Sequence, residues 1–137
     1  MSEEYAHLLV RDYTHWSLYV RETQNYLGRC VLWCKSKNAL SLAEATSPEL
    51  NEMGTICRQW EVAVQESFGA VWFNYAFLGN ELPHLHGHLI PRYQKPVTFA
   101  GVEFVDYEFG HMYRTNHDFT VNSEVLEQIR STIAQAL

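Results

Sequence analysis

Short runs of aromatic and β-branched residues mark the first strands of the chain. Two such runs, Trp16–Val20 and Arg29–Cys34, are separated by a polar segment that ends in a turn at Gly28. Because consecutive strands joined by a short turn usually pair with each other, we expect an antiparallel hairpin.

The longest periodic pattern lies in the middle of the chain and predicts a helix. Ser47 suits the N-cap, Pro48 the first helical position and Gly69 the C-terminal end. Between these limits, apolar residues recur at steps of three and four, which predicts one buried helical face made of Leu50, Met53, Ile56, Cys57, Trp60, Val64 and Phe68.

The second half of the chain predicts two more strands and a last helix. Ala70–Phe77 is typical of a largely buried strand, and His84–Ile90 of a further strand that stops at Pro91. Residues 92–121 have no clear period and are expected to be mostly loop, with a short strand at most. A final helix is expected to begin at Asn122 or Ser123. Hairpin strands with segregated helices favour an α+β fold and an antiparallel sheet.

Composition and charge narrow the classes of protein. The length of 137 residues fits one domain spanning 1–137, with 47% apolar and 19% charged residues. A net charge of −6 argues against a nucleic-acid-binding protein, but not against a small anionic ligand. No apolar run is long enough to cross a membrane, and Met1–Glu4 do not resemble a secretory signal. Three cysteines without a Cys-x-x-Cys pair indicate reduced thiols in a cytoplasmic protein.

Three of the seven histidines occupy alternate positions before Pro91: His84, His86 and His88. Side chains alternate between the faces of a strand, so these imidazoles, the histidine row, project from one surface about 6.6 Å apart. The intervening residues are apolar or small and suit a buried face. Because burying three titratable rings together is costly, the row indicates a functional site.

Two chemistries suit the histidine row. A zinc site would take two of the imidazoles and a further histidine or acid from elsewhere in the chain. Alternatively, one imidazole attacks phosphorus while a neighbour moves a proton and another holds the tautomer of the nucleophile. The second chemistry also needs donors for the phosphoryl oxygens, and the candidates are Asn74, the amides around Gly79 and Asn80, and Arg92 or Arg29.

The histidine row resembles the signature of the histidine triad (HIT) superfamily. The resemblance covers roughly residues 12–93 and rests on His84–Ile90, Pro91-Arg92, Phe73-Asn74, Gly79-Asn80, the Leu27-Gly28 turn and the helix from Ser47. It implies a HIT-like α+β fold, in which an antiparallel sheet of about five strands carries a long helix and a C-terminal helix.

The resemblance also implies a function. The chain would be a nucleotidyl hydrolase or transferase that cleaves a dinucleoside polyphosphate or a nucleoside phosphoramidate at the α-phosphorus. His86 corresponds to the nucleophile that forms a nucleotidyl-histidine intermediate, His84 to the residue that supports it, and His88 to the residue that contacts the phosphate. Asn74 and the Gly79-Asn80 turn correspond to the phosphate-side loop. No metal is implied in this step, no cofactor is expected, and the implied partners are a purine nucleotide and a second copy of the chain.

Two positions depart from the family pattern. Arg29 stands where a fourth histidine is usual, and Arg21 where an Asp or Asn usually binds the ribose. Arg29 is a candidate for a bidentate phosphate contact, or else for a surface ion pair without functional consequence. Glu22, Gln24 and Asn25 are candidates for the ribose contact. These departures keep an alternative function open, a non-catalytic nucleotide-binding module.

Three further expectations concern structure alone. The four tryptophans are expected mostly in packed positions. His111 is expected in a solvated loop, and Asp106 and Glu108 on a solvated face.

Overall fold

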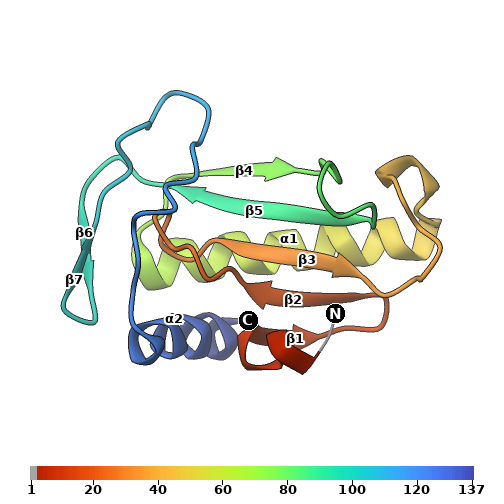
Figure 1. Cartoon of the computed structure of the whole chain (residues 1–137), viewed down its shortest axis with the longest axis horizontal. Coiled ribbons are helices and arrows are strands. Elements are labelled where there is room, and N and C mark those ends of the chain that lie inside the picture. The colour runs from red at the N-terminus through yellow and green to blue at the C-terminus, as the bar shows by residue number, and fades with distance from the viewer. Residues whose placement is uncertain (1–2) are drawn as a thin grey trace.

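The computed structural model describes residues 3–137, so the expectation for Met1 and Ser2 lies outside the described residues. The centre of the fold is a five-stranded sheet in the order β1-β2-β3-β5-β4, antiparallel throughout (Figure 1). Its strands are β1 (Leu9–Asp12), β2 (Trp16–Val20), β3 (Cys30–Cys34), β4 (Trp72–Ala76) and β5 (His86–Arg92). β2 and β3 pair along their whole length, which confirms the predicted hairpin.

Two helices accompany the sheet. α1 (Ser47–Phe68) runs behind the sheet, and α2 (Ser123–Ala136) lies beside β1 and contacts α1 (Figure 1). A small hairpin of β6 (Val97–Phe99) and β7 (Val102–Phe104) projects from one end, and the 3₁₀ helices η1 (Glu3–Leu8) and η2 (Leu42–Glu44) complete the elements. The predicted α+β fold is confirmed. No helix within residues 3–137 is long and apolar enough to cross a membrane.

The hydrophobic core lies between the sheet and α1. Trp16, Leu18 and Leu32 of the sheet are fully buried in one cluster with Ile56 and Trp60 of α1. Burial of such side chains stabilises the fold by about 1.5–3 kcal/mol each. The indole of Trp60 also donates to the backbone carbonyl of Gly28 at 3.2 Å. This bond ties α1 to the turn between β2 and β3.

The start of α1 differs from the prediction by one residue. Thr46, not Ser47, is the N-cap: its hydroxyl accepts from the backbone N–H of Glu49 at 3.3 Å, and the Glu49 carboxylate accepts from the N–H of Thr46 at 2.7 Å. This capping box satisfies two N–H groups that the first helical turn leaves without partners. The predicted end is confirmed, because Gly69 adopts a left-handed φ of 84° as the C-cap.

β4 is an edge strand and is more exposed than the sequence predicts. Phe73 and Tyr75 pack against Trp60 of α1, each with ring centroids 5.8 Å from that indole. On the other face, Trp72 is 66% exposed. The prediction of a largely buried strand with a packed Trp72 is therefore wrong, because an apolar run does not distinguish an edge strand from a central one.

β5 continues through Pro91 and ends at Arg92, so the prediction that Pro91 stops the strand is wrong. Pro91 pairs with Phe73 of β4, whereas pairing with β3 ends where Leu89 lies opposite Cys30. Pro91 has no backbone N–H to donate. Because it lies beyond the last residue that pairs with β3, no hydrogen bond between β5 and β3 is lost.

The segment 92–121 is mostly irregular, as predicted, but contains two short strands instead of one. The turn between β6 and β7 places Ala100 and Gly101 at positive φ values of 52° and 77°. The elements η1 and β1 have no counterpart in the sequence-based expectation, because each is too short to show a period.

Candidate active site

The structure gathers the histidine row on one face of the sheet. His86 and His88 lie on β5, with ring centroids 5.3 Å apart and nearly perpendicular planes. His84 precedes β5, and its ring stacks on Trp33 of β3 with centroids 4.2 Å apart. Trp33 stands opposite His86 in the sheet, and their centroids are 5.6 Å apart. One indole therefore forms a flat wall beside two of the imidazoles.

The opposite face of the same segment explains why small and apolar residues alternate with the histidines. Leu85 and Leu89 are buried in the core. A Cβ atom on Gly87 would lie 2.5 Å from Cε1 of Phe77, which is closer than carbon atoms can approach. Glycine at this position allows the Phe77 ring to pack directly beneath the backbone between His86 and His88.

Two backbone carbonyl groups determine where His84 and His86 carry their protons. Nδ1 of His86 lies 2.7 Å from the carbonyl oxygen of His84, and an oxygen of this kind only accepts, so Nδ1 is the protonated nitrogen. In the neutral ring, Nε2 of His86 then keeps a free lone pair. By the same argument, Nε2 of His84 donates to the carbonyl of Cys34 at 2.6 Å. His86 thus has a nitrogen, Nε2, whose lone pair is available to act as a nucleophile.

A cavity of about 520 Å³ opens beside His86 and His88. η1, β2, β3 and the loop before β5 supply the rest of its lining, which consists of Tyr5, Leu8, Tyr19, Val20, Arg21, Glu22, Thr23, Val31, Trp33 and Leu82. Aromatic and aliphatic side chains predominate, and the lining also includes the guanidinium of Arg21 and the carboxylate of Glu22. The cavity therefore suits a ligand that combines a flat apolar ring with negative charge.

Arg29 lies next to His88 and is buried, with 2% of its surface exposed. Its Nη2 is 3.4 Å from Nδ1 of His88, and its Nη1 donates to the hydroxyl of Thr115 at 2.7 Å. The alternative of a surface ion pair is therefore wrong. Burial, with the nearby charge of Arg21, lowers the pKa of Arg29 to about 10, so the guanidinium still carries its charge at neutral pH.

The surroundings of His88 favour its neutral form. Burial is the main cause of a pKa lowered to about 4, and the positive charges of Arg29 and Arg21 lower it further. Local positive charge of this kind also favours binding of an anion.

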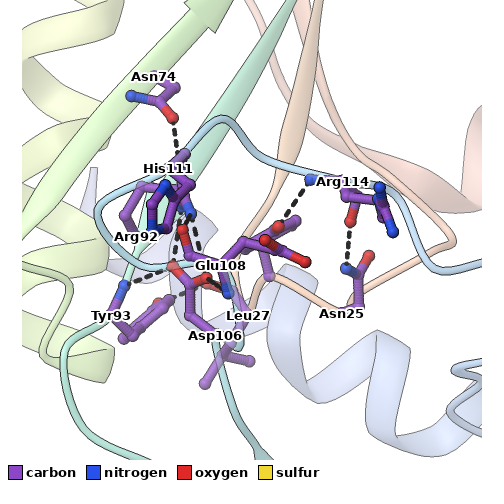
Figure 2. A network of polar contacts seen from close by, with 10 residues as sticks. Asn25, Leu27, Asn74, Arg92, Tyr93, Asp106, Glu108, His111 and Arg114 are labelled. Atoms are coloured by element: carbon purple, nitrogen blue, oxygen red, sulfur yellow. Dashed lines mark hydrogen bonds and ion pairs between the residues drawn. The ribbon is translucent and has the colours of Figure 1, made fainter.

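Arg92 lies at the centre of a separate polar network (Figure 2). Its Nε donates to the carboxylate of Asp106 at 2.8 Å, and its Nη1 donates to Oδ1 of Asn74 at 2.8 Å. Two backbone carbonyls also accept from this guanidinium, that of Glu108 at 2.8 Å and that of His111 at 2.7 Å. The side chains of Arg92 and Asp106 are only 4% and 0% exposed. The expectation that Asp106 belongs to a solvated face is wrong, because Asp106 is the buried counter-ion of Arg92.

No protein-family model matches the chain, and a search of curated proteins finds no match. Solved structures do match. A histidine triad (HIT) protein from Sinorhizobium meliloti 1021 is 15% identical, with a TM-score of 0.72 over 100% of this chain and 96% of that chain. A histidine triad protein from Bradyrhizobium japonicum is 17% identical, with a TM-score of 0.71 over 98% of this chain and 95% of that chain. The chain has the histidine triad fold.

A more distant match is a structure of uridylyltransferase, which is 18% identical with a TM-score of 0.60 over 95% of this chain and 41% of that chain. These likenesses confirm the fold that the histidine row predicts.

Within this histidine triad fold, the other residues singled out from the sequence lie in different places. Arg21 lines the cavity, whereas Arg29 lies behind His88 and does not. Gly79, with a φ of 67°, lines a separate recess of about 80 Å³ that also touches His84 and His86. Asn80 follows Gly79 and is exposed. The side chain of Asn74 contacts Arg92, and Asn74 is not part of the cavity lining.

The three candidates for a ribose contact, Glu22, Gln24 and Asn25, also lie in different places. Glu22 lines the cavity. Gln24 is buried in the β2–β3 turn, where it donates to the carbonyls of Arg21 and Arg29 at 2.7 Å and 2.9 Å. Asn25 donates to the carbonyl of Arg114 at 3.0 Å. Gln24 and Asn25 are therefore engaged in holding the turn and the loop around Arg114.

Sequence reasoning missed the three aromatic residues of the cavity, Tyr5, Tyr19 and Trp33. Trp33 was assigned to packing, and its place beside His84 and His86 follows only once the register of β3 against β5 is known. Tyr5 comes from η1, for which no periodic signal exists.

The zinc alternative finds no support in the geometry. Within residues 3–137, no three His, Cys, Asp or Glu side chains are arranged to hold a metal ion.

Proposed function

We propose that this chain is a nucleotidyl hydrolase or transferase that cleaves a nucleoside phosphate at its α-phosphorus through a covalent intermediate on His86. The observation that carries the proposal is the 2.7 Å bond between Nδ1 of His86 and the carbonyl of His84, which frees Nε2 as a nucleophile. The cavity beside His86 and the histidine triad fold support it, as does the likeness to a uridylyltransferase.

The proposed reaction has two displacement steps at phosphorus. In the first, Nε2 of His86 forms an N–P bond, and the bond from phosphorus to the leaving oxygen or nitrogen breaks with its electron pair. In the second, the oxygen of water, or of another acceptor such as phosphate, attacks phosphorus and the N–P bond breaks. This releases the nucleotidyl product and restores neutral His86. The proton that water loses balances the proton that the departing oxygen or nitrogen takes up. Charge on the phosphoryl oxygens is stabilised by His88 and by the positive field of Arg21 and Arg29.

The cavity is the proposed nucleoside site. Trp33 and Tyr5 offer aromatic surface for a base, in keeping with a purine nucleotide. Asn74, Gly79 and Asn80 are proposed contacts to the substrate phosphate; the recess lined by Gly79 also touches His84 and His86, which supports this role for the Gly79-Asn80 turn.

Rapid-quench mass spectrometry of the intact protein tests the proposal. The substrates are a diadenosine polyphosphate, to represent dinucleoside polyphosphates, and an adenosine phosphoramidate. A transient mass gain of one nucleotidyl group is expected, and its loss in His86→Ala. His117→Ala, which removes an exposed histidine outside the cavity, is the matched control and keeps the adduct. Normal turnover in His86→Ala contradicts the proposal.

A second candidate function is a non-catalytic nucleotide-binding module. The positive charges of Arg21 and Arg29 favour this second function, because they strengthen the binding of an anion but supply no nucleophile. Isothermal titration calorimetry that shows tight mononucleotide binding, with no turnover of either substrate, would select this function.

We further propose that the protein is a cytoplasmic homodimer. The exposed edge strand β4, with Trp72 at 66% exposure, supports association through the sheet edge. The free thiols of Cys30, Cys34 and Cys57 support a reducing compartment. Sedimentation velocity is expected to show a dimer, and Trp72→Ser to shift it toward the monomer.

A further inference from the structure

We propose that Arg29 is a positioning residue that fixes the tautomer of His88, with its proton on Nε2, and that adds to burial in holding His88 neutral. The catalytic value of this arrangement rests on the proposed function, whereas the protonation state of His88 can be measured without it.

The hydrogen-bonding capacity of the two side chains carries the argument. A guanidinium has five N–H donors and no acceptor. Nη2 of Arg29 lies 3.4 Å from Nδ1 of His88, so this nitrogen must offer a lone pair. In a neutral imidazole the proton then resides on Nε2. Protonation of His88 at Nδ1 would place two N–H donors, one on His88 and one on Nη2 of Arg29, face to face with no acceptor between them.

Arg29 is held in place over its whole length. Its backbone N–H donates to the carbonyl of Tyr26 at 3.0 Å, and its backbone carbonyl accepts from Gln24 at 2.9 Å. At the other end, Nη1 donates to Thr115 at 2.7 Å and the guanidinium lies 5.2 Å from the ring centroid of Tyr113. The position of the donor beside His88 is therefore set by the fold, without any ligand.

The charge of Arg29 is not neutralised by a carboxylate. None of the ion pairs within residues 3–137 includes Arg29, and its Nε is buried without a hydrogen-bond partner. A buried charge of this kind acts strongly on its neighbours, because the surrounding protein screens it poorly.

The other groups around His88 point in the same direction. Burial is the largest cause of the lowered pKa of His88, followed by the charge of Arg29 and then that of Arg21, which directly follows β2. Of the other titratable groups nearby, Tyr5, Tyr19 and Glu22 line the cavity, and Tyr113 packs against Arg29. Glu22 is the carboxylate of this lining, and because its side chain is exposed, solvent screens its charge.

The result is a pair of neighbouring imidazoles with opposite tautomers. His86 has its proton on Nδ1 and a lone pair on Nε2, whereas His88 has its lone pair on Nδ1 and its proton on Nε2. In the proposed reaction, the nucleophilic nitrogen therefore lies beside a neutral donor that can bind a phosphoryl oxygen or the leaving atom. A histidine at position 29 could face His88 as donor or acceptor, whereas an arginine only donates, so Arg29 specifies one tautomer.

Two-bond ¹⁵N–¹H NMR of protein labelled on the histidine rings tests this inference, since it reports tautomer and protonation directly. In the wild type, His88 is expected to show the Nε2–H pattern at pH 7 and to titrate near pH 4. In Arg29→Met, its pKa is expected to rise toward the ordinary 6.5, with a mixture of both tautomers. Arg29→Lys keeps a charged donor and is expected to restore both properties in part.

Arg21→Met is the matched control. It removes a positive charge near His88 without removing the hydrogen bond, so the pKa of His88 rises while the Nε2–H tautomer persists. A wild-type spectrum with the proton of His88 on Nδ1 overturns the inference, and this measurement needs no variant to fold. An unchanged His88 titration in folded Arg29→Met overturns it as well. A protein without any nucleotidyl transfer but with the Nε2–H pattern refutes the proposed function and leaves this inference standing.

Discussion

Replacement of Asp106 by alanine is expected to destabilise the fold more than any removal of a surface charge. The Asp106 carboxylate accepts two bonds from Arg92, at 2.8 Å and 3.1 Å, and one each from the backbone N–H groups of Tyr93 and Glu108, at 3.2 Å and 3.0 Å. The side chain of Arg92 is 4% exposed, so the variant leaves a buried guanidinium without its counter-ion. Such a loss costs about 3–5 kcal/mol, a large share of the roughly 5–15 kcal/mol that stabilises a typical domain.

Urea-induced unfolding, followed by tryptophan fluorescence, measures this loss. Glu127→Ala is the matched control, because it breaks an ion pair to Arg130 at 2.7 Å in which the Glu127 side chain is 56% exposed. Its expected cost is below about 1 kcal/mol. The double variant Arg92→Met with Asp106→Leu removes both buried charges and is expected to be more stable than Asp106→Ala alone.

A single result refutes this reasoning. If Asp106→Ala costs no more than Glu127→Ala, the ion pair between Arg92 and Asp106 is solvated in solution and does not hold the 105–114 loop against β5.

Three other predictions concern stability. Gly87→Ala is expected to cost about 1–3 kcal/mol in thermal unfolding, because its Cβ would lie 2.5 Å from the ring of Phe77, and a neutral effect would mean that this ring moves freely. Thr46→Ala is expected to cost about 1 kcal/mol and Ser47→Ala almost nothing; the reverse order in urea unfolding would restore Ser47 as the N-cap. His88 makes stability fall as the pH drops from 6.5 to about 4, since the unfolded chain takes up the proton first. Partial exposure reduces this effect to about 1–2 kcal/mol. Unfolding at both pH values should show a smaller loss in His88→Gln than in the wild type, and equal losses would contradict the assignment to His88.

Elements with strong local signals could be predicted from the sequence alone. The hairpin of Trp16–Val20 with the following strand, the helix that ends at Gly69, and the last helix after Asn122 all appear where expected. Their signals lie within a few residues of the structure they produce: β-branched runs, a helical apolar period, and residues suited to caps. The histidine row belongs to the same class, because a strand places alternate residues on one face whatever surrounds it.

Properties that depend on distant parts of the chain could not be predicted in this way. An apolar run predicts a strand at Trp72–Ala76 but cannot show that this strand lies at the edge of the sheet. Asp106 is as polar as any exposed acid, and its burial depends on Arg92, which lies 14 residues away in the sequence. The same holds for Arg29 and His88, which are 59 residues apart.

The sequence by itself therefore determined the α+β elements and the three histidines of the row, because both follow from the short-range geometry of the backbone. Only the tertiary structure decided which nitrogen of each imidazole carries a proton, which arginine faces the cavity, and which aromatic rings line it. Those properties depend on hydrogen bonds and burial between β3, β5 and the loop around Thr115. Such contacts form only when the sheet has set its strand order and register.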